Sequence, residues 1–307
     1  MKILNLPFAR SNVDRSAHVR VDESALATAW ENAAIIHFNG DGFLVESDHE
    51  GGPVSLKYLS AAQVTVPGER IFLGSHGGNF YFIYSSPDLI GAEHEYKTLR
   101  SIGHGLTDLH IGLAVHGQAV ALWHAKNPFC PVCGLALDLA LGGSVRRCAN
   151  AHEQYPRTDP AIIVLIKDSK DRILIGRQAI WPENRFSTFA GFVEAGESFE
   201  QCVIREVFEE SGVHVSNINY LGSQPWPFPQ SLMIAFEATI DDPESARPDG
   251  EEIVEIRWYD RDTLYLDAMS GDVLLPPFVS VARAMIESWY QQDQSSRPPL
   301  PVAEIWR

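Results

Sequence analysis

Glutamates follow a glycine-containing loop at intervals that place three of them on one side of a predicted helix. If residues 198–211 form a helix at about 100° per residue, Glu206, Glu209 and Glu210 fall within an arc of about 100°. Carboxylates four residues apart destabilise a helix by about 0.2–0.5 kcal/mol, so bound cations would stabilise such a cluster. Oxygen-only ligands suit Mg²⁺ or Mn²⁺, which commonly accompany substrate phosphates. A solvated acidic helix face is the alternative interpretation.

Cysteines and a histidine form a second candidate metal site. Cys130 and Cys133 make a CxxC turn, which places two thiolates on one tetrahedral Zn²⁺ ion. Cys148 follows, and His152 is the candidate for the fourth ligand. Such a site would be structural, because four protein ligands leave no position for water. A degenerate module that has lost its metal is the alternative. Cys202 lies within the predicted acidic helix and is interpreted as a core residue.

Residues 223–231 combine aromatic rings with regularly spaced prolines. The segment reads Ser-Gln-Pro-Trp-Pro-Phe-Pro-Gln-Ser, and its prolines keep the backbone extended. A rigid loop of this kind would present Trp226 and Phe228 for stacking on a base or a nicotinamide ring. Gln224 and Ser231 can supply hydrogen bonds. From composition alone, a proline-rich turn whose aromatic rings cover a core is an equal alternative.

The segment 191–213 resembles the signature of the Nudix hydrolase family at every defined position. It reads Gly, five residues, Glu, seven residues, Arg-Glu-Val, one residue, Glu-Glu, one residue and Gly-Val. The resemblance implies hydrolysis of a nucleoside diphosphate linked to another moiety, with metal ions held on the helix.

Within that family, the chain is similar to the NADH pyrophosphatases over roughly residues 126–290. The similarity rests on segment 223–231, on the cysteines and on Tyr-Pro-Arg-Thr-Asp-Pro at 155–160, although the second CxxC of the bacterial members is incomplete here. It implies cleavage of NADH or NAD⁺ to AMP and nicotinamide mononucleotide, removal of NAD caps from RNA 5′ ends, and a homodimer. The alternatives are a hydrolase for ADP-ribose or another dinucleotide, and a catalytically silent nucleotide sensor. All acids of the signature are present, which disfavours the sensor.

The same resemblance implies roles for individual residues. The metal ligands would be Glu206, Glu210, the carbonyl of Ala190 and Glu252, with Glu251 as the alternative to Glu252. Glu209 and Glu210 would act in catalysis, but the general base is not determined. Glu197 and Arg205 would form a structural brace between the loop and the helix. The implied substrate contacts are Tyr155, Gln224, Pro225, Trp226, Pro227, Phe228, Pro229, Gln230, Ser231 and Ala282. Tyr155 could equally be a core residue at a domain joint, and Ala282 could simply allow a helix to pack closely.

Apolar runs separated by glycine turns and periodic segments predict an α+β chain. We expect a β-rich N-terminal domain over 1–125 and a zinc-ribbon-like module over 126–157. A Nudix domain over 158–290 would be an α/β/α sandwich with a mixed sheet. The polar, proline-rich segment 291–307 is predicted to be a flexible tail.

Composition limits the remaining function classes. The 307 residues are 45% hydrophobic and carry a net charge of −16, which disfavours nonspecific nucleic-acid binding. No apolar run is long enough for a membrane span, and no secretory signal is evident, so we expect a cytoplasmic protein without membrane contact.

Overall fold

The computed structural model describes residues 5–47, 52–292 and 297–301. Its contacts divide the chain into two units. Unit 1 comprises residues 1–7, 159–224 and 231–307, and unit 2 comprises residues 8–158 and 225–230. The division near residue 158 lies where the sequence predicted the start of the Nudix domain. The predicted boundary at 125 does not separate units, because region 126–157 packs with the N-terminal region.

Unit 1 is built on a mixed sheet with strand order β13-β14-β10-β11-β15, and β12 pairs with β10. β10 runs parallel to β14 and antiparallel to β11 and β12. The elements are β10 (Asp159–Lys167), β11 (Ile173–Gln178), β12 (Phe189–Phe192), α5 (Phe199–Ser211), β13 (Ser216–Trp226), β14 (Ser231–Thr239), η5 (Pro243–Ser245), β15 (Ile253–Tyr259), α6 (Arg261–Ser270) and α7 (Val281–Tyr290).

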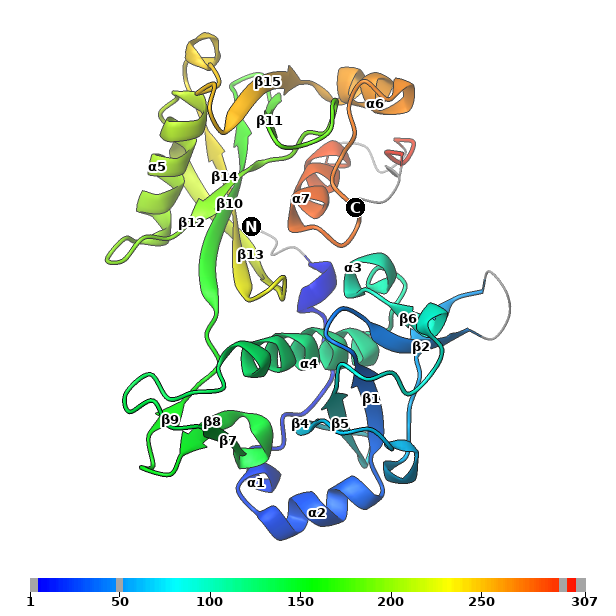
Figure 1. The fold of residues 1–307 in the computed structure, drawn as a ribbon. Coiled ribbons are helices and arrows are strands. Elements are labelled where there is room, and N and C mark those ends of the chain that lie inside the picture. The colour runs from blue at the N-terminus through cyan, green and yellow to red at the C-terminus, as the bar shows by residue number, and fades with distance from the viewer. Residues whose placement is uncertain (1–4, 48–51, 293–296, 302–307) are drawn as a thin grey trace. The chain divides into compact units, whose positions relative to one another are not determined.

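The central strand β10 contributes side chains to two hydrophobic cores, one on each face of the sheet. Successive side chains of a strand point to opposite faces. Ile163 and Leu165 therefore join the core beneath α6 and α7, whereas Ile162 and Val164 join the core beneath α5. Figure 1 shows α5 on one side of the sheet and α7 on the other. The predicted α/β/α sandwich with a mixed sheet is confirmed.

Helix α5 has sequence signals at both ends. Ser198 accepts a hydrogen bond from the backbone of Gln201, and the Gln201 side chain accepts one in return, which makes a capping box. The helix ends at Gly212, whose φ of 69° is left-handed and suits glycine. Cys202, Val203 and Val207 are buried and direct one helix face to the sheet.

Unit 2 contains a sheet of order β3-β2-β1-β5-β4, with β6 paired to β2, and a small sheet β7-β8-β9. The elements of this part of the chain, in order, are η1 (Pro7–Ala9), α1 (Ala17–Arg20), α2 (Glu23–Glu31), β1 (Ala34–Phe38), β2 (Phe43–Ser47), β3 (Val54–Leu56), η2 (Ala61–Gln63), β4 (Glu69–His76), β5 (Asn79–Ser85), η3 (Glu93–Glu95), β6 (Tyr96–Lys97), α3 (Leu99–Ile102), α4 (Asp108–Lys126), β7 (Leu137–Ala140), η4 (Leu141–Gly143), β8 (Val145–Cys148) and β9 (Glu153–Gln154).

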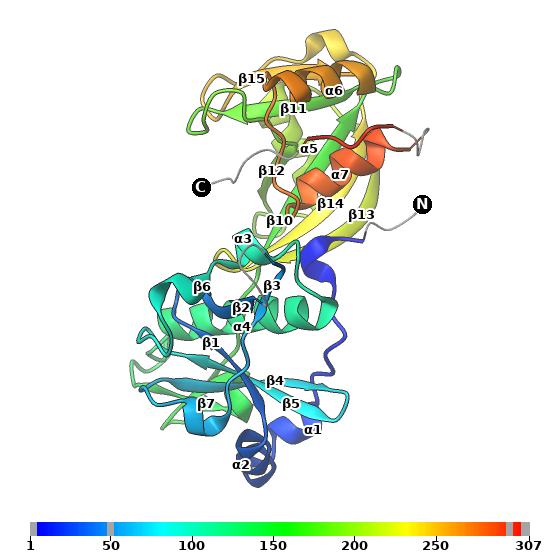
Figure 2. The same cartoon turned by 90° about the vertical axis from the view of Figure 1, so that its right-hand side faces the viewer.

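The larger sheet of unit 2 is covered on both faces. Trp30 of α2 packs edge-on against Phe82 of β5, at a ring-centroid distance of 5.2 Å. A side chain at Gly117 of α4 would collide with Ile83, the next residue of β5, so α4 lies close to the opposite face. Figure 2 shows α2 and α4 on either side of β4 and β5. The predicted β-rich character is present, together with one long buried helix, α4.

Strand β8 connects the small sheet to the larger one within unit 2. Arg146 is 6% exposed and pairs with Glu69 of β4 at 2.7 Å. The same guanidinium donates to the carbonyl oxygens of Leu137 and His124, at 2.7 and 3.1 Å. The buried charge is therefore neutralised and hydrogen-bonded, as burial requires. This arrangement explains why region 126–157 packs with the N-terminal region.

Residues 297–301 differ from the flexible tail predicted over 291–307. Leu300 is 4% exposed and belongs to the core beneath α7. Arg283 donates to the carbonyl oxygens of Leu300 and Pro301, both at 3.0 Å. Arg297 pairs with Asp262 at 2.9 Å. Gln291 and Gln292 follow α7 directly and donate backbone hydrogen bonds to the carbonyl oxygens of Glu287 and Trp289. Tail residues 293–296 and 302–307 lie outside the described residues.

Across the described ranges, no helix has the length and apolar character needed to cross a membrane.

Candidate active site

Glu210 is a buried carboxylate within a group of acids. Its side chain is 4% exposed, and one oxygen, Oε2, has no hydrogen-bond partner among the described residues. Burial raises its pKa to about 8, and the charges of Glu252, Glu206 and Asp249 act in the same direction. The backbone N–H of Ala190 donates to the carboxylate and opposes this shift. Such a group is stabilised by any cation that reaches Oε2.

The glycine at the start of the loop makes room for a second acid. A Cβ atom at Gly191 would overlap the carboxyl group of Glu206, so a larger residue there would displace this acid. Burial raises the pKa of Glu206, and Glu209 and Glu252 raise it further, against the opposing effect of Arg205. We refer to Glu206, Glu210 and Glu252 as the carboxylate cluster.

Arg205 connects the loop to the helix, as the sequence pairing of Glu197 and Arg205 anticipated. It donates two hydrogen bonds to Glu197, at 2.8 and 2.9 Å, and one to the carbonyl oxygen of Phe192 at 3.0 Å. Further hydrogen bonds reach Glu206 at 2.8 Å and Glu209 at 3.0 Å. The pairing with Arg205 lowers the pKa of Glu197 to about 2. One guanidinium thus orients three carboxylates, of which Glu209 is the most exposed, at 56%.

Two residues that the sequence analysis did not select position Glu252. The side chain of Gln178 donates to Glu252 Oε1 at 2.9 Å. The carboxylate of Asp249 accepts from the backbone N–H groups of Glu251 and Glu252, at 3.3 and 3.2 Å. The charge that acts on Glu206 and Glu210 is that of Glu252 rather than Glu251. The Asp-Gly pair before the two glutamates was the signal for this turn.

The carboxylate cluster fits a hard divalent cation. All its donors are oxygen atoms, and the charge of Glu252 contributes to the raised pKa values of both Glu206 and Glu210. The unpartnered oxygen of Glu210 supplies an open ligand position.

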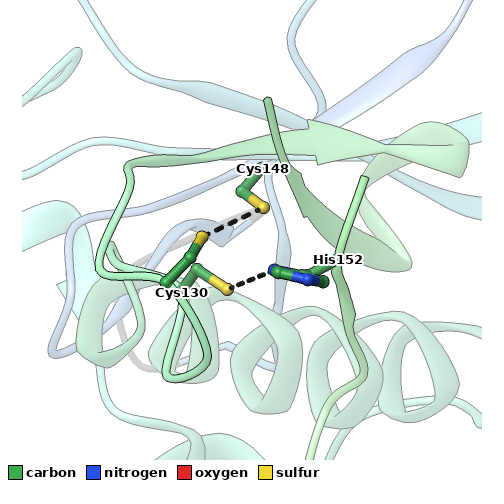
Figure 3. Close-up of side chains that lie close together, drawn as sticks. Cys130, Cys148 and His152 are labelled. Carbon is green, nitrogen blue, oxygen red and sulfur yellow. Dashed lines mark hydrogen bonds between the residues drawn. The ribbon is translucent and has the colours of Figure 1, made fainter. Parts of the chain in front are cut away.

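A separate group of ligands lies in unit 2, where Cys130, Cys133, Cys148 and His152 form the cysteine cluster. Their ligand atoms all lie within 4.8 Å of one another. The Cys130 sulfur is 3.6 Å from His152 Nδ1, and the sulfurs of Cys133 and Cys148 are 3.7 Å apart. Figure 3 shows Cys130, Cys148 and His152 pointing toward a common centre. The set is compatible with a tetrahedral zinc site.

The turn around Cys130 favours a thiolate. Burial raises the pKa of Cys130, but the backbone N–H groups of Val132 and Cys133 donate to its sulfur and lower the pKa to about 6. The turn is closed by a hydrogen bond of 2.8 Å from the N–H of Gly134 to the Cys130 carbonyl oxygen. Because the thiolate is the metal-binding form, this local geometry is compatible with zinc.

The residues predicted to contact substrate fall in both units. Gln224, Ser231 and Ala282 belong to unit 1, whereas Tyr155 and the segment Pro225–Gln230 belong to unit 2. Gln224 is completely buried, and its Nε2 donates to the carbonyl oxygen of Val279 at 3.0 Å. Its Oε1 has no hydrogen-bond partner within the described part of the chain.

The aromatic rings of the proline-rich loop pack together in unit 2. Trp226 and Phe228 make an edge-to-face pair at 5.0 Å, and Phe8 lies 5.6 and 6.2 Å from them. The guanidinium of Arg100 lies over both rings, at 5.2 and 4.2 Å. The Pro227 carbonyl oxygen accepts from the Gln118 side chain at 2.7 Å. Arg100 was not predicted from the sequence, because its role depends on a contact between residues distant in the chain.

Tyr155 and Ala282 lie in opposite environments. Tyr155 is 63% exposed, so the interpretation as a core residue is wrong, and its hydroxyl donates to Glu153 at 2.6 Å. Ala282 is 1% exposed and packs in the core beneath α7, which agrees with the close-packing interpretation.

Comparison with known proteins identifies relatives over nearly the whole chain. A family model described as NUDIX domain matches residues 157–277. The chain is 38% identical to NAD-capped RNA hydrolase NudC of Mycobacterium bovis over 92% of this chain and 94% of that protein. It is 35% identical to human NAD-capped RNA hydrolase NUDT12, over 60% of this chain and 42% of that protein. A solved structure of a Nudix hydrolase from Nitrosomonas europaea is similar with a TM-score of 0.44, at 19% identity, over 57% of this chain and 97% of that one.

Proposed function

This chain belongs to the Nudix hydrolase family, and on that premise we propose that it hydrolyses the pyrophosphate of NADH or NAD⁺ to AMP and a nicotinamide mononucleotide. We also propose that it removes NAD caps from RNA 5′ ends. The similarity to the NudC proteins extends over both units, which favours the NADH pyrophosphatase subfamily over other branches of the family.

The observation that carries the proposal is the buried acid Glu210. A carboxylate that is 4% exposed, and whose Oε2 has no donor in the described residues, is costly without a counter-charge. Within the described residues, the carboxylates paired with Arg205 are those of Glu197, Glu206 and Glu209. A cation bound beside Glu210 would remove that cost. Metal-assisted attack on a pyrophosphate is the chemistry that such a site supports best.

We assign Mg²⁺ or Mn²⁺ to Glu206, Glu210, Glu252 and the carbonyl oxygen of Ala190. A divalent ion held there would lower the pKa of bound water and offset charge on the phosphate. Arg205 holds Glu206 and Glu209 in place through hydrogen bonds of 2.8 and 3.0 Å. Glu209 is exposed and is available to orient or deprotonate the attacking water. Glu197 and Arg205 act as the brace between the loop and α5.

Substrate recognition is assigned to the loop 224–231 and to Tyr155. The half-buried rings of Trp226 and Phe228 are braced by Phe8 and Arg100, which favours a preorganised stacking surface. The exposed ring of Tyr155 is held by its hydrogen bond to Glu153 and is accessible to a ligand. Gln224, with one amide group already bonded to Val279, supports the loop from its base. Ala282 would act by permitting close packing of α7 rather than by a side-chain contact.

We further propose that the cysteine cluster binds one structural Zn²⁺ ion and that the chain is a cytoplasmic homodimer. The zinc assignment is supported by the mutual distances within 4.8 Å and by the N–H donors around Cys130. The dimer follows from the subfamily resemblance and is tested by light scattering coupled to size-exclusion chromatography. A monomeric mass at micromolar concentration would contradict it.

The decisive experiment is product analysis with NADH, ADP-ribose and NAD-capped RNA under identical concentrations of Mg²⁺ or Mn²⁺. We expect AMP and reduced nicotinamide mononucleotide from NADH, with a higher kcat/KM than for ADP-ribose. Capped RNA should yield RNA with a 5′-monophosphate. Faster hydrolysis of ADP-ribose than of both nicotinamide substrates would contradict the substrate assignment but not the metal site. Absence of metal-dependent hydrolysis of every substrate would contradict both.

A further inference from the structure

Unit 2 contains a cavity of about 500 Å³ that none of the functions above requires. It lies between α1 and α2 on one side, and β4 and the β7–β8 hairpin on the other. We call it the arginine cavity, after its lining residues Arg20, Arg70 and Arg147. Its volume lies within the range of about 300–1,000 Å³ that is typical of small-molecule sites.

Two of its arginines have no carboxylate partner within the described ranges. The Nε of Arg20 is buried and makes no hydrogen bond in that part of the chain. The guanidinium of Arg70 lies 4.7 Å from the centroid of the Trp30 ring and makes no ion pair within the described residues. Burial lowers the pKa of Arg15, and the nearby cation of Arg20 lowers it further. Positive charge is therefore concentrated here in a chain whose net charge is −16.

The local acids do not form ion pairs with Arg20 or Arg70 in the described residues. Glu69, next to Arg70 in the strand, is already paired with the buried Arg146 at 2.7 Å. Arg147 pairs with Glu153 at 2.6 Å and keeps further donors. Glu23 and Asp138 also line the cavity, and neither makes an ion pair within the described residues. With Arg147 paired, the two arginines without an ion pair in the described residues, Arg20 and Arg70, share the cavity with these two carboxylates.

The remaining lining adds an apolar wall and accessible backbone. Leu26, Leu139 and Leu141 supply apolar surface, and Gly142 and Gly143 have φ values of 63° and 86°. A side chain at Gly142 would crowd Leu26 and Phe72, at 3.3 and 3.1 Å, so glycine keeps this wall open. A ligand with a flat ring, hydroxyl groups and a phosphate matches an apolar wall, carboxylates and arginines.

We propose that the arginine cavity binds a nucleoside phosphate. The phosphate would receive charge-assisted hydrogen bonds from Arg20 and Arg70, with Arg147 contributing at the hairpin. The base would lie against the leucines, and the ribose hydroxyls would donate to Glu23 or Asp138. The ligand comes either from a free mononucleotide or from the nucleotides of an RNA chain, which share this chemistry. The site belongs to unit 2 and contains none of the residues assigned to pyrophosphate hydrolysis.

The test is calorimetric titration of the full chain, with its zinc and without added Mg²⁺ or Mn²⁺. The probes are AMP, adenosine and the 5′-phosphorylated RNA dinucleotide pApA. We expect AMP to bind about tenfold or more tightly than adenosine, because adenosine lacks the phosphate. The double variant Arg20→Gln/Arg70→Gln should weaken AMP binding by about tenfold or more. If pApA binds more tightly than AMP, the site is assigned to RNA. If pApA binds equally or more weakly, the site is assigned to free nucleotides.

Matched variants separate this site from the others. Lys97→Gln removes one exposed cation of unit 2 outside the cavity and should leave AMP affinity unchanged. Trp226→Ala reports any AMP that binds at the aromatic loop instead of the cavity. If the double variant loses its circular dichroism spectrum or its zinc, Arg70→Gln alone serves, because Arg70 is exposed. Equal AMP affinity in the wild type and the arginine variants, or binding lost only in Trp226→Ala, overturns the proposal.

Discussion

The carboxylate cluster of unit 1 and the cysteine cluster of unit 2 assemble metal-binding side chains in different ways. The cysteine cluster draws its ligands from one short stretch, Cys130 to His152, and the backbone of the same turn donates to Cys130. The carboxylate cluster combines two residues of α5 with Glu252, which precedes β15. Arg205 holds Glu206, and Gln178 holds Glu252.

The two clusters therefore differ in whether the protein itself compensates the charges of their ligand atoms. Four ligand atoms lie within 4.8 Å of one another in the cysteine cluster, which suits a closed structural site. In the carboxylate cluster, burial and like charge raise the pKa of Glu210 to about 8, and one of its oxygens has no partner in the described residues. That stored repulsion is useful for catalysis, because it favours a cation that can also bind water and phosphate. One cluster should consequently control folding and the other turnover.

The largest expected effect separates the clusters through activity. Glu210→Gln removes a metal ligand while preserving shape, so kcat should fall by about 10³-fold or more, equivalent to roughly 4 kcal/mol. The melting temperature should change little. The measurement is steady-state NADH hydrolysis with Mn²⁺ or Mg²⁺.

The matched control is Glu200→Gln, which removes an exposed acid of the same helix. Its kcat should remain within about twofold of the wild type. Near-wild-type turnover of Glu210→Gln would remove Glu210 from the metal site.

The second prediction addresses folding through the cysteine cluster. Cys148→Ser should release about one equivalent of zinc and lower the melting temperature by about 5–10 °C, because metal binding contributes to the stability of the folded hairpin. His152→Ala leaves three thiolates and should have a smaller effect. Zinc is measured by mass spectrometry and unfolding by calorimetry. Less than about half an equivalent of zinc in fresh wild-type protein would contradict the site.

The third prediction concerns binding rather than either metal cluster. Trp226→Ala should raise the KM for NADH by about tenfold, since stacking on one ring contributes roughly 1–3 kcal/mol. The KM for a minimal diphosphate without a nucleobase should change much less. Kinetics with both substrates provide the measurement. Equal losses for the two substrates would make the aromatic loop a scaffold for Phe8 and Arg100.

The smallest expected effect is the pH dependence of stability without added divalent ions. The pKa of Glu210 rises from its ordinary 4.5 to about 8 on folding, so the folded state retains a proton that the unfolded chain has released. The free energy of unfolding should therefore fall as pH rises from about 4.5 to about 8. Urea unfolding at several pH values measures this slope.

Glu210→Gln should flatten that slope, and Mn²⁺ should restore stability most strongly near pH 8. Glu200→Gln should keep the wild-type slope. A slope that is the same with and without Glu210 would show that another group titrates.

Local patterns predicted a large share of the fold. Successive apolar side chains of β10 point to opposite faces and therefore require a core on each side of the sheet. The capping box and Gly212 mark the two ends of α5. The sandwich could therefore be derived from sequence. Helix α4 was harder to predict as a helix, because it is buried on several sides and its apolar residues are not confined to one face. The packing of 297–301 was missed, since a polar, proline-rich segment gives no sign that Arg283 will bind its carbonyl oxygens.

The sequence by itself determined the chemistry of the two clusters. Spacing on one helix selects carboxylates for a hard cation, and a CxxC turn selects thiolates for zinc, because both depend on residues close together in the chain. Tertiary structure decided how each side chain is used. It left Glu210 buried beside Glu206 and Glu252, assigned Gln178 to Glu252, and stacked Arg100 on the aromatic loop. It also gathered Arg20, Arg70 and Arg147 around one cavity. These features join segments far apart in sequence, and burial and electrostatic interaction act only after folding brings such segments together.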